Sequence, residues 1–284
     1  MAKPRPSQAL MRQHSTWRLG VKIAGFVTFL LLALALRIWV VEGVKVPDRS
    51  ISPDFKPGAW VWICKLPWCI EEAHPGAPVL LGTRAGDRIL RILAGTPGTS
   101  IQGETNGKIT GPGFKRRLSE ESWFLENATI RIPKKGDSLV FSKLGTAEFD
   151  LAMKLYQQVH PKKPVKIRAS LWIDNREAPL EKAVSAQINN IPVKIRELGN
   201  LNWQEIRLVE MQVLRNEHGS SKVEVRREAW KDSTRVEGIR IHENLYFVVC
   251  LKARDCVDSR ELGFIPQSRM LGSRIPLSLA NFKH

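Results

Sequence analysis

Short runs of alternating apolar and polar residues recur along most of the chain, and this pattern predicts a mainly β protein. Glycine or proline stands near the ends of several runs, as is typical where strands give way to turns. The predicted strands cover residues 59–64, 79–81, 89–94, 129–132, 138–141, 165–173, 205–214, 222–226 and 245–250. Apolar residues with helical spacing predict a helix over 146–159 and a second one over 179–188.

The longest apolar run, residues 19–41, lies near the N-terminus and contains only two charged residues. Its uninterrupted part is short for a hydrocarbon layer of about 30 Å. Lys22 and Arg37 can extend their charged groups to the two interfaces, where Trp39 is also favourable. A cleavable secretory signal has a similar pattern, but no small-x-small site follows closely. We therefore expect an uncleaved transmembrane anchor over 19–41.

The distribution of charge predicts an orientation for this anchor. Lys and Arg number 44 against 28 Asp and Glu, a formal net charge of +16. Residues 1–18 contain four basic residues and no acidic one, so the positive-inside rule places them in the cytoplasm. The other basic residues lack the aromatic or Cys/His patterns of nucleic-acid binders, which favours a basic surface facing anionic lipid.

Four cysteines are too few to build a disulfide-rich miniprotein, but they agree with a domain on the outer face of the membrane. Four cysteines allow three pairings, and the simplest joins Cys64 to Cys69 and Cys250 to Cys256. A zinc site would need closer C-x₂-C spacing and histidine partners. We expect two local disulfides, no metal and no cofactor.

Five segments follow one another in an order that one peptidase family shares. Residues 46–55 read VPDRSISPDF just after the anchor. Segments 57–63 and 75–81 both begin with Pro-Gly, segment 89–98 ends in Gly-Thr-Pro-Gly, and segment 258–266 reads DSRELGFIP. On these segments the chain resembles the bacterial type I signal peptidases, membrane-bound serine endopeptidases that cleave signal peptides from exported preproteins.

The resemblance implies a mainly β fold, in which a β-rich catalytic core carries an inserted second β-rich domain. It also implies a single-pass protein of the bacterial cytoplasmic membrane with its main domain on the periplasmic face. The expected division is a cytoplasmic segment 1–18, an anchor 19–41, a catalytic-type core 42–102 with 242–284, and an inserted domain 103–241.

The resemblance also assigns catalytic positions. The family uses a serine nucleophile and a lysine base, because a serine hydroxyl needs a group that accepts its proton. Ser50 falls on the nucleophile position, but Arg91 falls on the base position, and a guanidinium with a pKa above about 12 cannot accept a proton. Asp48 stands where a hydroxyl often helps to bind the oxyanion, so Asp48 and Ser50 form the expected oxyanion region. Cys256 replaces the serine that orients the lysine.

Other positions are assigned to substrate binding and to structural support. By resemblance, the pockets for the small residues of a peptide bound as a β-strand would be lined by Val44, Val46, Ile51, Phe55, Ile89 and Leu90. Each of these can equally be a core residue of a β domain. The expected support consists of Ser259 and Cys256 together with an ion pair between Asp258 and Arg260 that has no catalytic role.

Two functions stay open from the sequence. In the first, the chain is a signal peptidase working by an altered route, with Asp48 or a water as base and Arg91 as an electrostatic clamp. In the second, Asp48 and Arg91 form an ion pair that closes a silent site, and the chain is a binding or assembly subunit of a secretion system. A pilin-maturing peptidase of a conjugation system is a related alternative. The expected partners are preprotein signal peptides, membrane lipid, and secretion or conjugation machinery, not nucleic acid.

Overall fold

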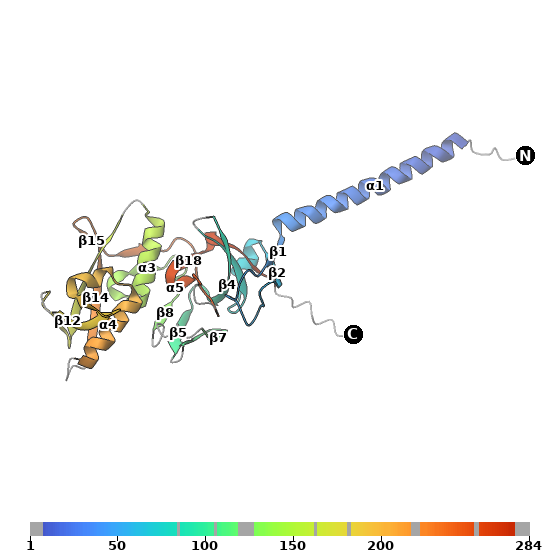
Figure 1. Cartoon of the computed structure of the whole chain (residues 1–284). Helices are drawn as coiled ribbons and strands as arrows, with labels where there is room; N and C mark the ends of the chain where they lie inside the picture. Colours follow the sequence, from blue (N-terminus) through green and yellow to red (C-terminus); the bar gives the residue numbers. More distant parts are fainter. Residues whose placement is uncertain are drawn as a thin grey trace, which may run out of the picture.

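The computed structural model describes residues 8–83, 86–104, 107–118, 128–161, 164–180, 183–216, 222–252 and 256–275. In it, one long helix projects from a body built largely of antiparallel strands (Figure 1). The prediction of a mainly β protein is confirmed. The ends of the predicted cytoplasmic segment and core, residues 1–7 and 276–284, lie outside the described residues.

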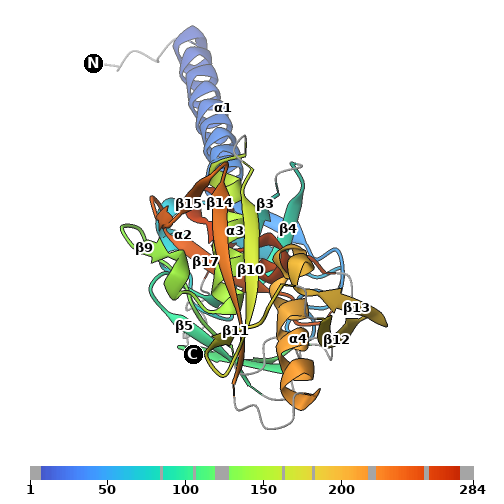
Figure 2. The same ribbon diagram turned by 90° about the vertical axis from the view of Figure 1, so that its left-hand side faces the viewer.

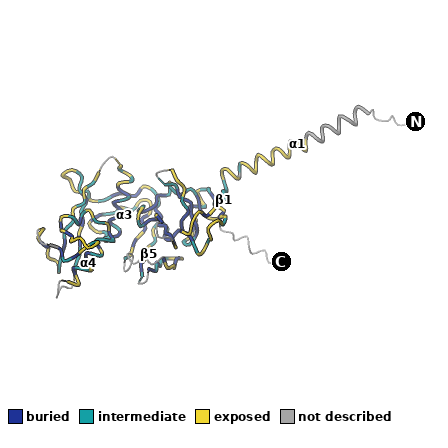
Figure 3. The backbone as a smooth tube through the Cα atoms, in the orientation of Figure 1, coloured by how far each residue is buried: buried dark blue, intermediate teal, exposed yellow. Residues whose placement is uncertain are grey.

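The projecting helix is α1 (Gln8–Trp39), and its segment Val21–Trp39 is long and apolar enough to cross a membrane. The described part of this segment is exposed along almost its whole length, whereas buried residues are concentrated in the body (Figure 3). The helix ends at Trp39 and Val41 begins strand β1, so the predicted anchor is two residues too long at this end. The membrane location and orientation stay predictions.

The largest sheet joins strands from early and late parts of the chain. Its seven strands lie in the order β1-β2-β19-β3-β4-β17-β18 and pair antiparallel. They are β1 (Val41–Lys45), β2 (Trp60–Cys64), β3 (Pro78–Gly82), β4 (Arg88–Gly95), β17 (Leu245–Val249), β18 (Ile265–Pro266) and β19 (Met270–Arg274). The short helix α2 (Pro67–Glu71) follows β2, and α5 (Ser259–Leu262) and the 3₁₀ turn Gln267–Arg269 flank β18.

A second, four-stranded sheet in the order β7-β6-β5-β8 shares the same core. Its strands are β5 (Ser100–Glu104), β6 (Lys108–Gly111), β7 (Phe114–Arg117) and β8 (Thr129–Arg131). Ile101 and Phe114 of this sheet belong to one cluster of buried side chains with Leu90 of β4 and Phe149 of helix α3 (Thr146–Val159). This core therefore continues well past residue 103, where the sequence predicts that the inserted domain begins.

A separate hydrophobic cluster lies within residues 171–225, inside the range of the predicted insert. It is built by helix α4 (Trp203–Asn216), a sheet in the order β11-β10-β14-β15 and the hairpin β12-β13. Figure 2 shows β10 and β14 side by side, with α4 next to the hairpin. The strands are β10 (Lys166–Ile173), β11 (Arg176–Glu177), β12 (Ala183–Ile188), β13 (Ile191–Lys194), β14 (Val223–Lys231) and β15 (Thr234–Val236); β9 (Ser138–Val140) pairs with β16 (Gly238–Arg240), and 3₁₀ turns cover Phe141–Lys143 and Ile195–Asn200.

The predicted elements are confirmed with two exceptions. Helix α3 has the predicted bounds, but the predicted strand 205–214 is wrong, because this segment forms α4. Its buried residues recur every three or four positions, which is the helical period, and the Asn202 side chain accepts hydrogen bonds from two backbone N–H groups of the first turn. The predicted helix 179–188 is also wrong. The turn Asn189–Asn190, with positive φ at both residues, closes the hairpin between β12 and β13.

Candidate functional site

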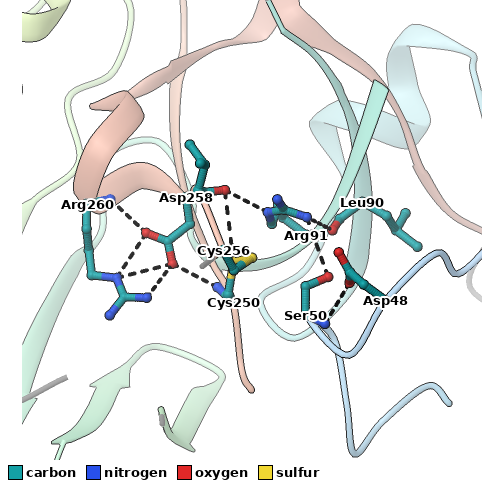
Figure 4. Close-up of a disulfide and its surroundings, with 9 residues drawn as sticks. Asp48, Ser50, Leu90, Arg91, Cys250, Cys256, Asp258 and Arg260 are labelled. Atoms are coloured by element: carbon teal, nitrogen blue, oxygen red, sulfur yellow. Dashed lines mark hydrogen bonds and ion pairs between the residues drawn. A yellow bond between two sulfur atoms is a disulfide. The ribbon is translucent and has the colours of Figure 1, made fainter. Parts of the chain in front are cut away.

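Ser50 and Arg91 are both buried and contact each other beside strand β4 of the largest sheet. Ser50 lies in the turns that follow β1, and Arg91 lies in the middle of β4. Arg91 Nη1 is 3.4 Å from Ser50 Oγ, and only 1% of Ser50 and 6% of Arg91 is exposed (Figure 4). The residues at the expected nucleophile and base positions are thus in contact.

The guanidinium of Arg91 is held in place by backbone carbonyls on two sides. Nε donates to the carbonyl of Val257 at 2.8 Å, and Nη1 also donates to the carbonyl of Leu90 at 2.7 Å. One of these acceptors belongs to β4 itself and the other to the segment after Cys256, so the side chain links two parts of the chain (Figure 4). Arg91 is therefore a fixed donor of hydrogen bonds, directed at Ser50.

Burial lowers the pKa of Arg91, and the negative charges of Asp48 and Asp258 oppose this effect. A guanidinium has a pKa above about 12 in water and has no acceptor atom while it is protonated. At neutral pH the group next to Ser50 Oγ is thus a cation that donates hydrogen bonds. It cannot take the proton that Ser50 would have to lose before attacking a peptide bond.

The predicted ion pair between Asp48 and Arg91 is wrong, since the described residues hold no such pair within 4 Å. Asp48 is exposed, and its Oδ1 accepts a hydrogen bond of 2.7 Å from the backbone N–H of Ser50. An aspartate readily accepts from the N–H two residues further along, because this closes a local turn. Asp48 thus stays close to solvent instead of entering the interior to reach Arg91.

This short hydrogen bond affects the expected oxyanion region directly. The backbone N–H of a serine nucleophile is one of the donors that stabilise the negative oxygen formed during peptide hydrolysis. Here that N–H of Ser50 is already bound by a carboxylate. A second negative charge at this place would be repelled by Asp48 rather than stabilised.

The segment after β17 supports the site. Asp258 is only 1% exposed and forms an ion pair of 2.9 Å with Arg260. Its carboxylate also accepts a hydrogen bond from the backbone N–H of Cys250, as Figure 4 shows. The Oγ of Ser259 accepts a hydrogen bond from the backbone N–H of Val248. The predicted structural pair of Asp258 and Arg260 is confirmed. Both predicted disulfides are confirmed as well: Cys250–Cys256, which lies next to the residue that binds Arg91, and Cys64–Cys69, which ties β2 to α2. Residues 253–255 lie outside the described part.

The predicted pocket residues do not all come together. Val46, Ile51 and Leu90 are fully buried in the first cluster, and Val44 and Phe55 pack against it. Ile89 packs against another cluster, because successive residues of a strand face opposite sides and Ile89 precedes Leu90 in β4. The expectation that Ile89 shares one pocket with the others is therefore wrong. The buried side chains of the remaining residues fill the core of the domain.

Two further sets of contacts around the site are not predicted from the sequence. The backbone N–H of Leu251 donates to the carbonyl of Ser50 at 2.7 Å, which joins the end of β17 to the Ser50 turn. Glu42 of β1 forms ion pairs with Arg88 of β4 and with Lys65. The available signal was the presence of opposite charges at the starts of two segments that both lead into the site, Glu42 before Ser50 and Arg88 before Arg91.

Comparison with protein-family models gives no match for this chain, and comparison with curated proteins gives none either. The observations that bear on function are therefore the motif order in the sequence and the geometry around Ser50.

Proposed function

We propose that this chain is a membrane-anchored protein of the signal-peptidase type that binds signal-peptide segments of exported preproteins without hydrolysing them. The observation that carries the proposal is the surroundings of Ser50: its hydroxyl faces the cationic Arg91, and its backbone N–H is bound by Asp48. The first contact leaves Ser50 without a base, and the second places a negative charge where an oxyanion would form.

Peptide binding needs exposed strand edges, and the sheet provides two of them near Ser50. Within the described residues, β1 pairs with β2 alone. Strand β4 pairs with β3 along Arg88–Ile92, but its contact with β17 begins only at Ile92. The open side of β4 before Ile92 and the open side of β1 can each accept an extended peptide through backbone hydrogen bonds. Both edges lead to the Ser50–Arg91 contact.

The aromatic surface beside these edges supports a position close to the membrane. Trp60 and Trp62 on β2 are 64% and 56% exposed, and both rings approach to 3.3 Å from the position that a Cβ of Gly43 would take. Gly43 follows the helix end at Trp39 by four residues, so the chain limits the separation to about 14 Å. Tryptophan is enriched at the interface between lipid and water. An exported preprotein that is still held in the membrane would meet the sheet edge on this side.

A second candidate function keeps catalysis, and the 3.4 Å contact between Ser50 and Arg91 favours it. Burial shifts the pKa of Arg91 downward, which is the direction that a base requires. In this case Ser50 would attack a peptide bond and the chain would process preproteins or the pilins of a conjugation system. Another group would still have to accept the proton, because a guanidinium has no acceptor atom until it is deprotonated.

Binding and cleavage of one peptide distinguish the two candidates. Full-length protein in detergent micelles is mixed with a fluorescent signal peptide that carries an Ala-x-Ala site. We expect saturable binding, an uncleaved peptide by mass spectrometry, and the same two results for Ser50→Ala. Cleavage by the wild type that disappears in Ser50→Ala would establish the second candidate instead. Absence of binding would refute the first.

A further inference from the structure

A pair of charged side chains connects two strands that are not neighbours in the sheet, and a third charged side chain binds to the pair. Glu42 of β1 makes a two-pronged contact with Arg88 of β4, with Oε1 at 2.7 Å from Nη1 and Oε2 at 2.9 Å from Nη2. Lys65 Nζ lies 3.3 Å from the same Oε2. We call Glu42, Arg88 and Lys65 the clasp.

The clasp and the Ser50–Arg91 contact bridge the same two segments. In the sheet order, β2, β19 and β3 separate β1 from β4, so side chains of β1 and β4 can meet only if the sheet curls round. Glu42 precedes Ser50 in one segment, and Arg88 precedes Arg91 in the other. The two segments therefore run in the same general direction, with the clasp at the end closer to α1 and the Ser50–Arg91 contact at the other. We call the interval between the unpaired edges of β1 and β4 the cleft.

The backbone groups of β4 that do not pair with β3 lie on the side of this cleft. Leu93 accepts from Gly76 and donates to Ala77, both on the β3 side. Alternate residues of a strand direct their backbone groups to opposite neighbours, so those of Leu90 point away from β3. The Leu90 carbonyl accordingly accepts from the Arg91 side chain and not from another strand.

The open edge of β1 follows from the same rule. Val46 donates to Ala59 and accepts from Gly58 on the β2 side. The backbone groups of Gly43 and Lys45, at odd positions, therefore point away from β2. A peptide strand added at either edge would lie about 4.8 Å from it. At the outer end of the cleft, the Glu42–Arg88 contact crosses this space.

We propose that the clasp holds the outer end of this cleft closed, and that an extended peptide can lie along the cleft only when the clasp opens. This inference rests on the peptide-binding function proposed above and adds how access of the peptide is regulated. The clasp residues are partly exposed, unlike the buried pair of Asp258 and Arg260, so opening exchanges ion pairs for water at small cost. The clasp can thus open reversibly, while the buried pair maintains the fold around Ser50.

The test measures how tightly a fluorescent Ala-x-Ala signal peptide binds to the full-length protein in detergent micelles, by fluorescence anisotropy. We expect Glu42→Gln to lower the Kd about fivefold, the effect of removing a partly exposed ion pair. Added NaCl should lower the Kd of the wild type, because salt screens the clasp, and should have less effect on Glu42→Gln. Arg88→Gln removes the same contact from the other side and should give the same result if Glu42→Gln folds poorly.

Two controls separate the clasp from a general charge effect. The triple variant Glu42→Arg with Lys65→Glu and Arg88→Glu reverses every charge of the clasp and should return the Kd to the wild-type value. Glu104→Gln removes a comparable exposed ion pair, Glu104–Lys108 at 2.9 Å in the second sheet, and should leave the Kd unchanged. Equal peptide affinity of the wild type and both single clasp variants would overturn the clasp but not peptide binding. No binding by any of these proteins would overturn the proposed function and the clasp with it.

Discussion

Two buried arginines of this protein differ in the groups that bind their guanidinium. Arg227 lies on β14 against α3, where its Nη1 is 3.0 Å from the carboxylate of Asp150. Arg91 lies on β4, and its side chain donates to the hydroxyl of Ser50 and to two backbone carbonyls. Burial lowers the pKa of both guanidinium groups. One arginine is neutralised by a carboxylate in direct contact, while the other is held by uncharged oxygens alone.

The difference indicates different roles. A buried ion pair is costly to break, and without Arg227 the carboxylate of Asp150 would keep only the partly exposed Lys154 at 3.6 Å. Arg227 is therefore part of the framework that joins α3 to β14. In the described part of the chain Arg91 has no carboxylate within 4 Å, and its guanidinium donates to Ser50 and to two backbone carbonyls instead. The arrangement at Arg91 suits a site where a ligand or a reacting group meets a fixed donor.

The largest expected effect comes from giving Ser50 a base. Arg91→Lys replaces the guanidinium with an amine whose pKa burial depresses, and Asp48→Ser frees the Ser50 N–H and supplies a hydroxyl. Each such group typically contributes about 10²-fold to the rate. We expect the double variant to cleave an Ala-x-Ala preprotein at least about 10²-fold faster than the wild type, as measured by gel assay.

The control for this gain is Ser50→Ala in the same double variant, which should abolish the cleavage. A folded double variant that binds the peptide but does not cleave it would show that the site lacks more than a base and an oxyanion donor. Wild-type cleavage that needs Ser50 and falls on Arg91→Lys would refute the silent site.

The next effect compares the two arginines by stability. Arg227→Met leaves the buried carboxylate of Asp150 with only the partly exposed Lys154, 3.6 Å away, and should lower the free energy of unfolding by about 3 kcal/mol, the lower end of the range for breaking a buried ion pair. Arg91→Met leaves only carbonyls and a hydroxyl without their donor and should lower it by about 1–2 kcal/mol. Urea unfolding of the full chain in one detergent, followed by circular dichroism, gives both values. Equal losses for the two variants would mean that Arg91 is a framework residue like Arg227.

The sequence predicts the region around the site better than the region around the second cluster. Strands β2, β3, β4 and β17 alternate or are continuously apolar, and Gly or Pro lies near several of their ends, so period and boundaries agree. The disulfides could be predicted because each pairs cysteines only a few residues apart. The segment of helix α4 resembles a strand in the sequence because its mixture of apolar and charged residues also fits alternation, and the capping residue Asn202 is the signal against a strand.

Within the site, the sequence predicts the contact between Ser50 and Arg91 but not the other contacts and hydrogen bonds around it. Ser50 and Arg91 could be paired through the motif order. The attachment of Asp48 to the Ser50 N–H could not, because it depends on a local turn that competes with an ion pair across the cleft. The different surroundings of Ile89 and the clasp depend on how the sheet alternates and curls, which a linear motif does not encode.

The smallest expected effect is a difference in how stability depends on pH. It involves two glutamates, Glu42 in the part of the molecule that contains Arg91 and Glu210 in the part that contains Arg227, whose pKa values are shifted in opposite directions. Hydrogen bonding to Arg88 lowers the pKa of Glu42 below its ordinary 4.5, whereas burial raises the pKa of Glu210 on α4 above it. The stability from Glu42 is therefore present above pH 4.5 and is lost as the pH falls through the lowered value. The stability from Glu210 is present at acid pH and is lost as the pH rises from 4.5 through the raised value.

Substitution by glutamine removes the contribution of each glutamate to the pH dependence of stability, and the two substitutions should change this dependence in opposite directions. Relative to the wild type, Glu42→Gln should be less stable at neutral pH, and the difference should shrink as the solution becomes acidic. The stability of Glu210→Gln relative to the wild type should increase as the pH rises above 4.5, the ordinary pKa of the carboxyl group. The reason is that only the unfolded chain of the wild type is then stabilised by a solvated charge at this position. Its side-chain oxygen can still accept from the Val225 N–H, which Glu210 binds at 2.9 Å, so packing is kept. Urea unfolding of the three proteins over a pH series checks both signs, and parallel curves would refute the assignment of either glutamate.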